Sequence, residues 1–570
     1  MNTHTEILAE DSRRQLRQSE REDIPLDVYN RRWIILGVLC TSLMIVVIGN
    51  TSLNVALPRM SEALGLSNSQ QQWVVDAYSL VFAGMLFTAG TLGDRFGRKG
   101  FMQAGIVLFG LGSAYTTFFG DSAGSVIAAR AVMGIGGALV MPATLSILVN
   151  CFPSGQRAKA IAIWSGIAGG GGAVGLVLGG WLIEHFWWGS AFAINIPVTL
   201  IALGLGAYFI PSSKDRHPQK LDPVGAVLSM VGLVVFVYGL IEAPHWGWTS
   251  PKSLGMIVAG LTILAGFVLW EMRSASPMLD VRLFKNKNFS VSSLSMMLVF
   301  LTMFGFFFVV SQLFQLVLGY GPFESGLRML PIMPLMVIAA PLSASFVPKF
   351  GARYVVGGGM MLTAIGVAIL STLDAGSGYG HVLGGMVPMA IGMGLTMSPL
   401  TELIMSSVPR DKAGIGSAMN DTTREVGTTL GVAILGSILS SGYTSKIGGL
   451  ASTLAPQAQS SVESSLAGAL GTANQLAAGG DNAAAAQIVA AAKDAWAHGL
   501  QLSMGIGAGI VVIAAIICVK FLPGRGDTAD ADDINVAATN DADIVNADID
   551  NADIDNADID SGSIGLVPVG

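Results

Sequence analysis

Three charged residues lie close together in an otherwise apolar stretch. Asp421 and Glu425 are four residues apart, and Arg424 is three residues after Asp421. In a helix this spacing places both carboxylates on one face with the guanidinium beside them. One acid is left in surplus, and such a group can alternate between a protonated and a cation-paired state. We expect proton-coupling chemistry here; a structural Asp421–Arg424 bridge, with Glu425 exposed to the cytoplasm, is the alternative.

The elements that position these residues are membrane-spanning helices. The chain is 52% hydrophobic and only 12% charged, which excludes an ordinary water-soluble domain. Apolar stretches of about 18 or more residues, each able to cross a bilayer, recur along the chain and predict an all-α membrane protein of about fourteen spans. The predicted spans are approximately 33–53, 72–92, 100–119, 124–148, 160–183, 189–210, 224–243, 253–271, 290–317, 327–347, 353–372, 382–404, 416–439 and 500–522.

The charge distribution predicts that both termini are cytoplasmic. Most of the 31 Lys and Arg residues lie before the first span, in loops after even-numbered spans, or just after the last span, as expected for cytoplasmic segments. Residues 1–32 form a charged arm, and the first helix should remain as an uncleaved anchor. Residues 523–570 are acidic and repeat Asn-Ala-Asp-Ile-Asp, which predicts a disordered cytoplasmic tail acting as a spacer or as a partner-binding segment.

Two loops predict an internal duplication. The loop 90–99 follows the second span, and a weaker echo at 348–353 follows the tenth, with Phe96-Gly97 aligned on Phe350-Gly351. Two six-helix halves, 33–210 and 289–522, would then flank an inserted helix pair at 211–288, and parallel halves place a substrate site near the midplane of the membrane. We expect 440–496 to be a long extracellular loop with room for a short helix, and assign it no function.

The first of these loops carries a family signature. Residues 90–99 read Gly-Thr-Leu-Gly-Asp-Arg-Phe-Gly-Arg-Lys, and this resembles the G-x-L-x-D-R-x-G-R-K loop of the major facilitator superfamily at every specified position. Glycines permit a tight turn, and basic residues suit an anionic leaflet. Cytoplasmic positive charge alone would not explain the aspartate. We expect a conformational loop formed by Gly90, Asp94, Arg95, Gly97, Arg98 and Lys99.

Arg130 stands inside the fourth predicted span. A guanidinium within a bilayer costs about 2.5–3.5 kcal/mol on insertion scales, so it should have a partner. With Gly134, Gly136 and Gly137 after it, it is similar to the R-x-x-x-G-x-G-x-A pattern of the superfamily's drug:proton antiporters. Its charge would then tune a nearby proton-carrying acid; bonding to helix carbonyls in a purely structural role is the alternative.

A glycine stripe marks the fifth predicted span. It resembles the antiporter signature G-x-x-x-G-P-x-x-G-G, with Leu176 where proline is expected. Small residues at this spacing allow close helix packing, which alone would also produce the stripe. The stripe consists of Gly171, Gly175, Gly179 and Gly180.

Residues 195–197, 222–225 and 277–284 add to these motifs. Together they make residues from about 30 to 522 similar to the fourteen-span drug:proton antiporter family. Within that family, the chain most resembles bacterial exporters of quaternary ammonium compounds and other lipophilic cations. The resemblance implies a multi-pass protein of the bacterial cytoplasmic membrane that exports small molecules by alternating access. The proton gradient would drive it without a cofactor or metal. The substrate itself is not implied.

Two family acids are absent. The residue nine before Pro58, where the family has an acid, is Gly49, and the tenth span has Pro334-Leu335-Met336 without a carboxylate. The acids Glu184 and Glu271 at span ends should be solvated. If Asp76 does not contact substrate, it is an ordinary acid at a helix end. If Phe308 does not contact substrate, its ring faces the protein core or the lipid. The candidate substrate contacts are Asp76, Trp73, Asn50, Gln312, Gln315 and Phe308.

Other classes of protein remain open to different degrees. An uptake symporter shares the same fold, and an exporter of lipids or cell-envelope precursors fits every motif. A non-transporting receptor or scaffold is supported only by the acidic tail. The sequence contains no nucleotide-binding loop, hydrolytic triad or metal cluster, so we predict neither an ATP-driven pump nor an enzyme and no nucleic-acid partner; protein partners are not assigned.

Overall fold

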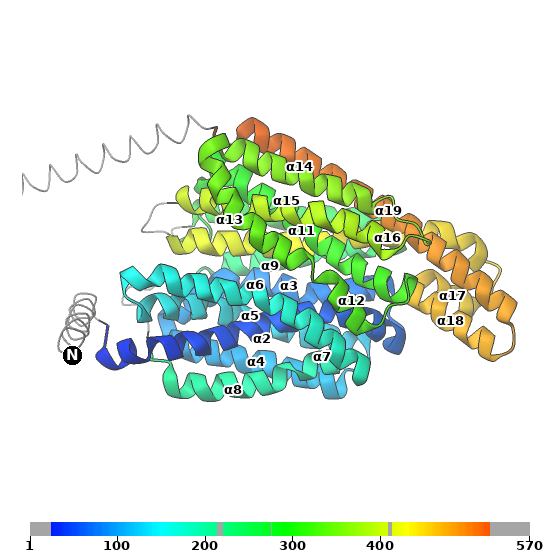
Figure 1. Cartoon of the computed structure of the whole chain (residues 1–570), viewed down its shortest axis with the longest axis horizontal. Helices are drawn as coiled ribbons and strands as arrows, with labels where there is room; N and C mark the ends of the chain where they lie inside the picture. Colours follow the sequence, from blue (N-terminus) through cyan, green and yellow to red (C-terminus); the bar gives the residue numbers. More distant parts are fainter. Residues whose placement is uncertain (1–23, 214–220, 275, 409–412, 525–570) are drawn as a thin grey trace, which may run out of the picture.

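The computed structural model describes residues 24–213, 221–274, 276–408 and 413–524, and within these ranges the regular structure is helical, without β-strands (Figure 1). The all-α prediction is confirmed. Most of the predicted N-terminal arm and nearly all of the acidic tail lie outside the described residues. The first helix begins at Leu26, so it takes in the last residues of the predicted arm.

The first group of helices, called here the first half, is built on α2 and α5. The helix α2 packs on α6 and α8, and α5 packs on α3 and α4. The short α7 leads directly into α8, so these two together form the sixth predicted span. The elements are α2 (Leu26–Leu64), α3 (Asn68–Phe96), α4 (Arg98–Phe119), α5 (Ala123–Cys151), α6 (Ser154–His185), α7 (Ser190–Ala193) and α8 (Asn195–Phe209).

The second half repeats this arrangement. The helix α14 packs on α15 and α19, and α11 packs on α16. A π-helical turn, η2, continues α11, and α12 runs into α13. The elements are α11 (Lys287–Gln312), η2 (Leu313–Val317), α12 (Pro322–Met329), α13 (Ile332–Phe350), α14 (Ala352–Leu370), α15 (Tyr379–Ser406), α16 (Ala413–Ala451), α17 (Pro456–Ser464), α18 (Leu466–Ala478) and α19 (Asn482–Phe521).

The inserted pair joins the two halves. The helices α9 (Pro223–Trp246) and α10 (Pro251–Arg273) pack on each other, and α9 also contacts α3 and α16. An apolar cluster at this junction combines Leu80 of α3 and Ala433 of α16 with Val237 and its neighbours on α9. The linker to α11 contains a 3₁₀ turn, η1 (Val281–Lys285). The insertion is therefore a packing element between the halves.

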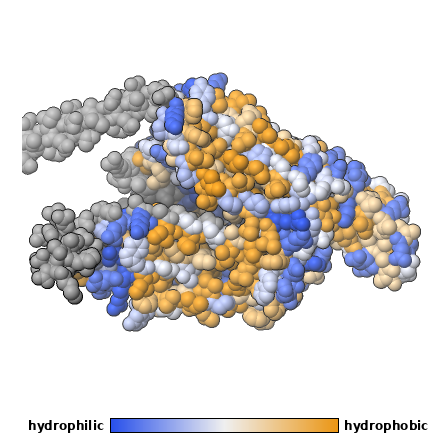
Figure 2. All heavy atoms as spheres, in the orientation of Figure 1, coloured by the Kyte–Doolittle hydropathy of each residue, from blue (hydrophilic) through white to orange (hydrophobic). Residues whose placement is uncertain are grey.

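The described helices have the properties of membrane spans. Thirteen of the helical segments in the described part of the chain are long and apolar enough to cross a bilayer. The helix α6, 32 residues long, covers the fifth predicted span and packs along α2. Figure 2 shows hydrophobic side chains gathered over the flanks of both halves, with hydrophilic residues toward the ends of the helices. The chain is a multi-pass membrane protein.

The prediction of a long loop at 440–496 is wrong. The helix α16 continues to Ala451, α17 and α18 fill most of the interval, and α19 begins at Asn482. These helices project beyond the membrane-spanning bundle (Figure 1). Tyr443 ties them to α16, since its hydroxyl donates to the carbonyl of Val462 at 2.7 Å. Alanine is the strongest helix former, and a search for apolar spans overlooks helices of mixed polarity.

The two aligned loops have matching backbone geometry. Gly97 and Gly351 both have positive φ, +121° and +82°. After each glycine, a backbone N–H bonds the chain that follows the last helix of the same half: Arg98 donates to Ser213 and Arg353 donates to Pro523. Eight residues further on, Gly105 packs closely on α5 and Gly359 packs closely on α15. These correspondences support the duplication inferred from the sequence.

We predict that Gly97→Ala lowers the thermal stability of the purified protein in detergent. A side chain at φ +121° costs about 1–3 kcal/mol of strain, although no atom lies within 4 Å of the added methyl. Gly100→Ala is the matched control, because it also has open space but no positive φ. Intrinsic fluorescence during heating measures both, and equal melting temperatures for the two variants would contradict the strain argument.

Candidate functional site

The charged residues of α16 do not form a tight bridge. The closest approach of Arg424 to Asp421 is 3.9 Å, from Nη1 to Oδ1. Arg424 instead donates to the hydroxyl of Thr401 on α15 at 3.2 Å and lies over the ring of Phe300 on α11 at 5.5 Å. Its Nε is buried without a hydrogen-bond partner. The Asp421–Arg424 bridge is thus at the limit of an ion pair, and Arg424 is held mainly by its neighbours.

Glu425 faces the first half. Its carboxylate lies near the side chain of Ser79 on α3 and within electrostatic range of Arg130 on α5. Its Oε2 atom is buried and has no hydrogen-bond partner. This position differs from the alternative in which Glu425 is simply exposed to the cytoplasm. The acid is in the interface between the halves.

Arg130 is fully buried in the same interface. Its Nε donates to the carbonyl of Val74 at 3.1 Å, and its Nη2 donates to Oδ1 of Asn50 at 2.9 Å. The guanidinium carbon lies 4.5 Å from the ring centroid of Tyr78, a cation–π distance. The remaining nitrogen, Nη1, has no hydrogen-bond partner. Three helices of the first half therefore hold Arg130 while one of its donors is left available.

The glycines that follow Arg130 explain how Tyr78 reaches it. A Cβ at Gly134 would come within 2.6 Å of the carbonyl of Tyr78, and one at Gly137 would come within 2.6 Å of its hydroxyl. Gly136 makes an equally close approach to α4 at Gly105. Larger side chains at these positions would push α3 and α4 away from α5. The glycine pattern therefore fixes the position of the arginine.

The buried polar atoms of this interface that lack partners within the described protein include Nη1 of Arg130, the hydroxyl of Tyr78 and Oε2 of Glu425. An unsatisfied buried group costs about 1–3 kcal/mol, more when charged. The cluster can therefore accept a proton or new hydrogen bonds at low cost, which is the chemistry that coupling requires. The sequence did not identify Tyr78 or Ser79 as site residues, because only packing brings them to the charged groups.

The absent acid of the first span has a steric explanation. A Cβ at Gly49 would lie 2.7 Å from the ring of Phe109 and 3.2 Å from the amide of Asn195. An aspartate therefore has no room at this position. The neighbouring Asn50 supplies a neutral acceptor for Arg130 in its place.

The other candidate substrate contacts take part in helix packing. The ring of Trp73 packs against that of Tyr238 on α9 at a tilt of 44°, with ring centroids 5.7 Å apart, and Asp76 is fully buried. Gln315 donates to the carbonyl of Val55 on α2 at 2.8 Å. Gln312 donates to the carbonyl of Phe308, one helical turn before it, and both residues are buried. The structure does not gather these residues around one common cavity.

The conformational loop binds helices of the first half together. Asp94 accepts from Nε of Arg98 at 2.6 Å and from the hydroxyl of Ser146 on α5 at 3.4 Å. Lys99 donates to the carbonyl of Ala207 near the end of α8 at 2.8 Å. Arg95 lies over the adjacent ring of Phe96, and Gly90 is in ordinary contact with Pro142 of α5.

The glycine stripe of α6 packs on two helices. Gly171, Gly175 and Gly179 face α2, where added side chains would meet Val47, Thr51 and Ser52. Gly180 faces the second half instead, and a Cβ there would lie 2.7 Å from the carbonyl of Pro322 on α12. On the same seam, Gly326 of α12 makes a very close approach to the carbonyl of Leu176.

Hydrogen bonds between the halves gather at the end of the bundle opposite the start of α2, called here the far end. The hydroxyl of Ser311 donates to the carbonyl of Asn54, and the amide of Asn68 donates to Ser440 at 3.3 Å. Glu184 accepts from the backbone N–H of Phe323 at 2.9 Å. These contacts, with Gln315, close the far end in this conformation.

Glu184 and Glu271, both predicted to be solvated at span ends, differ in their exposure. The side chain of Glu184 is exposed, although it also bonds the second half. Glu271 is only 2% exposed and accepts from the backbone N–H of Leu279 at 3.0 Å. The prediction of a solvated carboxylate at Glu271 is therefore wrong, because the linker after α10 folds back over it.

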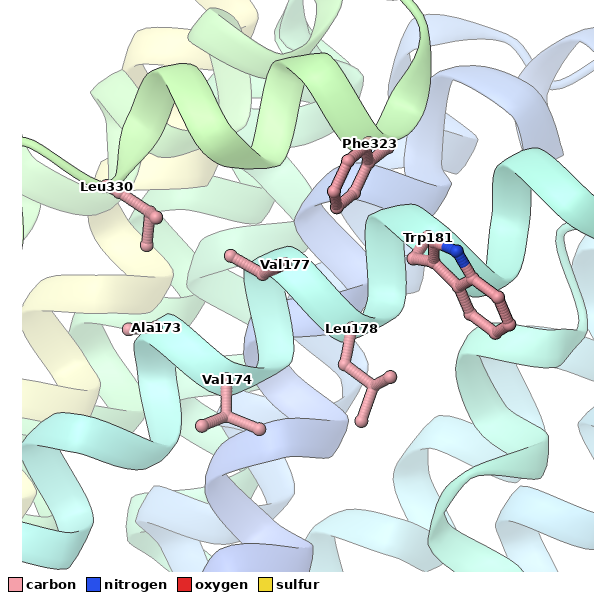
Figure 3. Close-up of a pocket in the computed structure, with 7 residues that line it drawn as sticks. All are labelled: Ala173, Val174, Val177, Leu178, Trp181, Phe323 and Leu330. Carbon is pink, nitrogen blue, oxygen red and sulfur yellow. The ribbon is translucent and has the colours of Figure 1, made fainter.

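An apolar groove lies on the seam between α6 and α12, away from the charged cluster (Figure 3). Its volume is about 430 Å³. Figure 3 shows Trp181 and Phe323 near one end of the groove and Leu330 near the other. Every residue that lines it is hydrophobic: Ala173, Val174, Val177, Leu178, Trp181, Phe323 and Leu330. Among the described residues, no group of three or more His, Cys, Asp or Glu side chains is arranged to hold a metal.

Comparisons with known proteins agree with this architecture. A family model described as Major Facilitator Superfamily matches residues 39–432. The multidrug efflux pump LfrA of Mycolicibacterium smegmatis is 34% identical over 85% of this chain and 95% of its own. The methyl viologen resistance protein SmvA of Salmonella typhimurium is 33% identical over 83% of this chain and 95% of its own. The puromycin resistance protein pur8 of Streptomyces alboniger is 30% identical over 88% of this chain and 93% of its own.

Solved structures share the fold. A bacterial homolog of the human lysosomal transporter Spinster superposes with a TM-score of 0.60 at 20% identity, covering 86% of this chain and 96% of that one. The xylose transporter XylE from E. coli superposes with a TM-score of 0.53 at 16% identity, covering 86% of this chain and 97% of that one. These likenesses concern the arrangement of helices.

We predict that Gly175→Ala destabilises the packing of α6 on α2. The added methyl would overlap with Thr51 Oγ1 and press on the backbone of Ile48, and overpacking of this kind costs about 1–3 kcal/mol. Gly170→Ala on the same helix is the matched control, since nothing lies within 4 Å of its Cβ. Thermal unfolding in detergent compares the two variants. A Gly175→Ala protein as stable as the Gly170→Ala protein would contradict the proposed close packing.

Proposed function

The chain belongs to the major facilitator superfamily, and from this premise we propose that it exports lipophilic, cationic drugs or related small molecules in exchange for protons by alternating access. The relatives named above, which include a multidrug efflux pump and a methyl viologen resistance protein, support export of such compounds. The observation that carries the proposal is that two buried and incompletely hydrogen-bonded charged groups, Arg130 of the first half and Glu425 of the second half, lie within electrostatic range of each other. No enzymatic reaction is needed for this role.

The orientation of the chain in the membrane follows from its charge distribution. Most Lys and Arg residues outside the spans lie in segments at the end where α2 begins, and a positive excess of this kind is typical of the cytoplasmic side. Both termini are then cytoplasmic, and the far end faces outward. The membrane is the bacterial cytoplasmic membrane. The cross-half hydrogen bonds at the far end correspond to an outward-closed state.

The proposed cycle uses the acids of α16. With the outer side open, Glu425, assisted by Asp421, takes a proton, and its attraction for a cation is lost. The halves then rock, the proton leaves to the cytoplasm, and the ionised carboxylate accepts a cationic substrate. The protein then returns to the outward-open state, where a new proton binds to the carboxylate and the substrate is released. Arg130 opposes the negative charge of Glu425 throughout, so neither bound state is held too tightly.

The driving force is sufficient for accumulation outside the cell. One elementary charge moving through about 100 mV is worth roughly 2.3 kcal/mol. A tenfold concentration gradient costs about 1.4 kcal/mol. One proton exchanged for one neutral molecule therefore supports more than a tenfold gradient from the membrane potential alone. One proton exchanged for one monovalent cation moves no net charge, so the pH gradient alone drives that exchange, at about tenfold per pH unit. No cofactor is required.

The remaining motifs are proposed to control the rocking motion. The residues of the conformational loop hold α3, α4, α5 and α8 together, so the first half can move as one body. The α6 stripe supports the same half through α2, and Gly180 permits close contact with α12 when the outer side is closed. The six candidate substrate residues named from the sequence lie between or beside these helices, and Asn50 is the one that directly touches Arg130.

A second candidate function is export of lipids or cell-envelope precursors. The apolar groove between α6 and α12 favours it, since a hydrocarbon chain fits an all-apolar groove of about 430 Å³. The lack of an acid at Gly49 also removes one site for a dication. Transport assays with fluorescent lipids distinguish this candidate from drug export.

We predict that Glu425→Gln abolishes efflux of ethidium from cells, because a glutamine can neither take up a proton nor hold a cation by charge. A protonophore should abolish wild-type efflux as well. Glu402→Gln is the matched control, since Glu402 is an exposed acid near the end of α15. Fluorescence of preloaded cells reports the rate.

Two results would count against the proposal. Wild-type cells that lose ethidium no faster than cells without the protein would remove the cation-export reading. Efflux by Glu425→Gln at the rate of Glu402→Gln would remove Glu425 from the coupling mechanism.

A further inference from the structure

Polar side chains follow one face of α3 from the far end to the charged cluster. Asn68, Gln72, Asp76 and Ser79 are separated by four, four and three residues, so in a helix they lie on one stripe. All four are buried, with exposed fractions between 0 and 6%. A continuous buried polar stripe in a membrane helix is expensive and points to a function.

The opposite side of this stripe is formed by α16. The amide of Asn68 donates to Ser440 at 3.3 Å, and Ser437 donates to Oε1 of Gln72 at 3.3 Å. Further along, Ser79 lies near Glu425. The two helices run antiparallel, so descending α3 from Asn68 to Ser79 corresponds to descending α16 toward Glu425. The polar groups therefore form a file between the halves, which we name the α3–α16 file.

Asp76 occupies the middle of the file without a partner. It is 0% exposed, and neither of its carboxyl oxygens has a hydrogen-bond partner in the described protein. Its neighbours one turn away on the stripe contact α16: Gln72 bonds Ser437, and Leu80 packs on Ala433. Asp76 must therefore face the same seam. An ionised carboxylate without a partner is very costly there, whereas a protonated carboxyl can remain and can also give up its proton.

Two further atoms beside Asp76 are also unsatisfied. Nε2 of Gln72 and the hydroxyl of Thr429 are buried without partners. Thr429 lies four residues after Glu425 and eight before Ser437, which places it on the face of α16 that lines the file. Unpartnered polar atoms thus occur on both helices, in the stretch between the far end and Glu425.

We propose that the α3–α16 file conducts protons between the outer side and Glu425, with Asp76 as the intermediate proton carrier. This inference rests on the proposed proton-coupled function. The protonated carboxyl of Asp76 passes its proton to the hydroxyl of Ser79, which accepts one proton and donates another to Glu425. Asp76 then takes a replacement proton from the outer side, so Asp76 and Glu425 both end neutral and no proton is created or lost. The step from Asp76 to Ser79 is three residues along the helix, roughly 4.5 Å of rise.

In this outward-closed conformation the surroundings suit the passage of protons and leave no opening for a drug. The far end is closed by hydrogen bonds between the halves, and an apolar cluster of α3, α9 and α16 side chains covers one flank of the file. Other ionisable groups on the packed elements are Tyr238 and Glu242 on α9, Arg130 on α5, and Asp421 and Arg424 deeper on α16. Asp76 thus serves the proton and does not contact the substrate.

The test compares proton-driven transport with substrate binding in the purified full chain. In proteoliposomes, Asp76→Asn should slow ethidium transport driven by an imposed pH gradient by roughly 10-fold or more, the scale of a lost proton-transfer group. Ethidium binding in detergent should stay within about twofold, because binding takes up no proton. Ethidium exchange without a gradient should be preserved, because one ethidium replaces another at the site without net proton uptake. Asp121→Asn is the matched control, since Asp121 is an exposed acid near the same end.

Two variants guard against an effect on folding. Asp76→Glu keeps a carboxyl and should restore much of the proton-driven rate. Thr429→Val removes a hydroxyl of the file without touching an acid and should slow proton-driven transport while ethidium exchange continues.

The possible results separate the inference from the proposed function. If the Asp76→Asn protein transports ethidium under the pH gradient as fast as the Asp121→Asn protein, the relay is overturned. A loss of ethidium affinity that matches the loss of transport would also overturn it and would make Asp76 a substrate residue. If the wild-type protein binds ethidium but shows no transport driven by the pH gradient, the proposed function itself fails, and the relay fails with it.

Discussion

A positive charge of one half of the molecule faces a negative charge of the other half inside the membrane, and the rest of the structure depends on this interaction. Arg130 and Glu425 interact electrostatically, yet each keeps one polar atom without a hydrogen-bond partner. Buried charges are tolerated only with partners. In the proposed cycle, a proton on Glu425, or a cation beside it, would change the attraction between the halves and so link binding to the movement of helices.

The packing around this pair is specialised to hold it in place. Glycines on α5 let Tyr78 and the backbone of α3 reach Arg130, and Asn50 of α2 supplies a neutral acceptor. The inserted helix α9 packs against both α3 and α16 at the same level. The stripe of α6 allows α2 to approach closely, and Gly180 allows α12 to do so from the second half. Movement between the halves must therefore act on the seam that contains the charges.

Much of this could be predicted from the sequence, because the signals are local. Hydropathy gave the spans, helical spacing placed Asp421 and Glu425 on one face, and the glycine patterns indicated close packing. The contact of Glu425 with Ser79, the position of Tyr78 and the burial of Glu271 depend on helices distant in sequence, and no local pattern encodes them. The helices α17 and α18 were missed since they are neither apolar spans nor strongly amphipathic.

The most direct test of the account is proton release from the purified protein when ethidium binds, measured with a pH-sensitive dye in weakly buffered detergent solution. The account predicts that saturating ethidium displaces protons from the wild-type protein and that Glu425→Gln, given enough ethidium to bind, releases fewer. Equal proton release by the two proteins would contradict the central claim that Glu425 exchanges a proton for a cation at the interface between the halves.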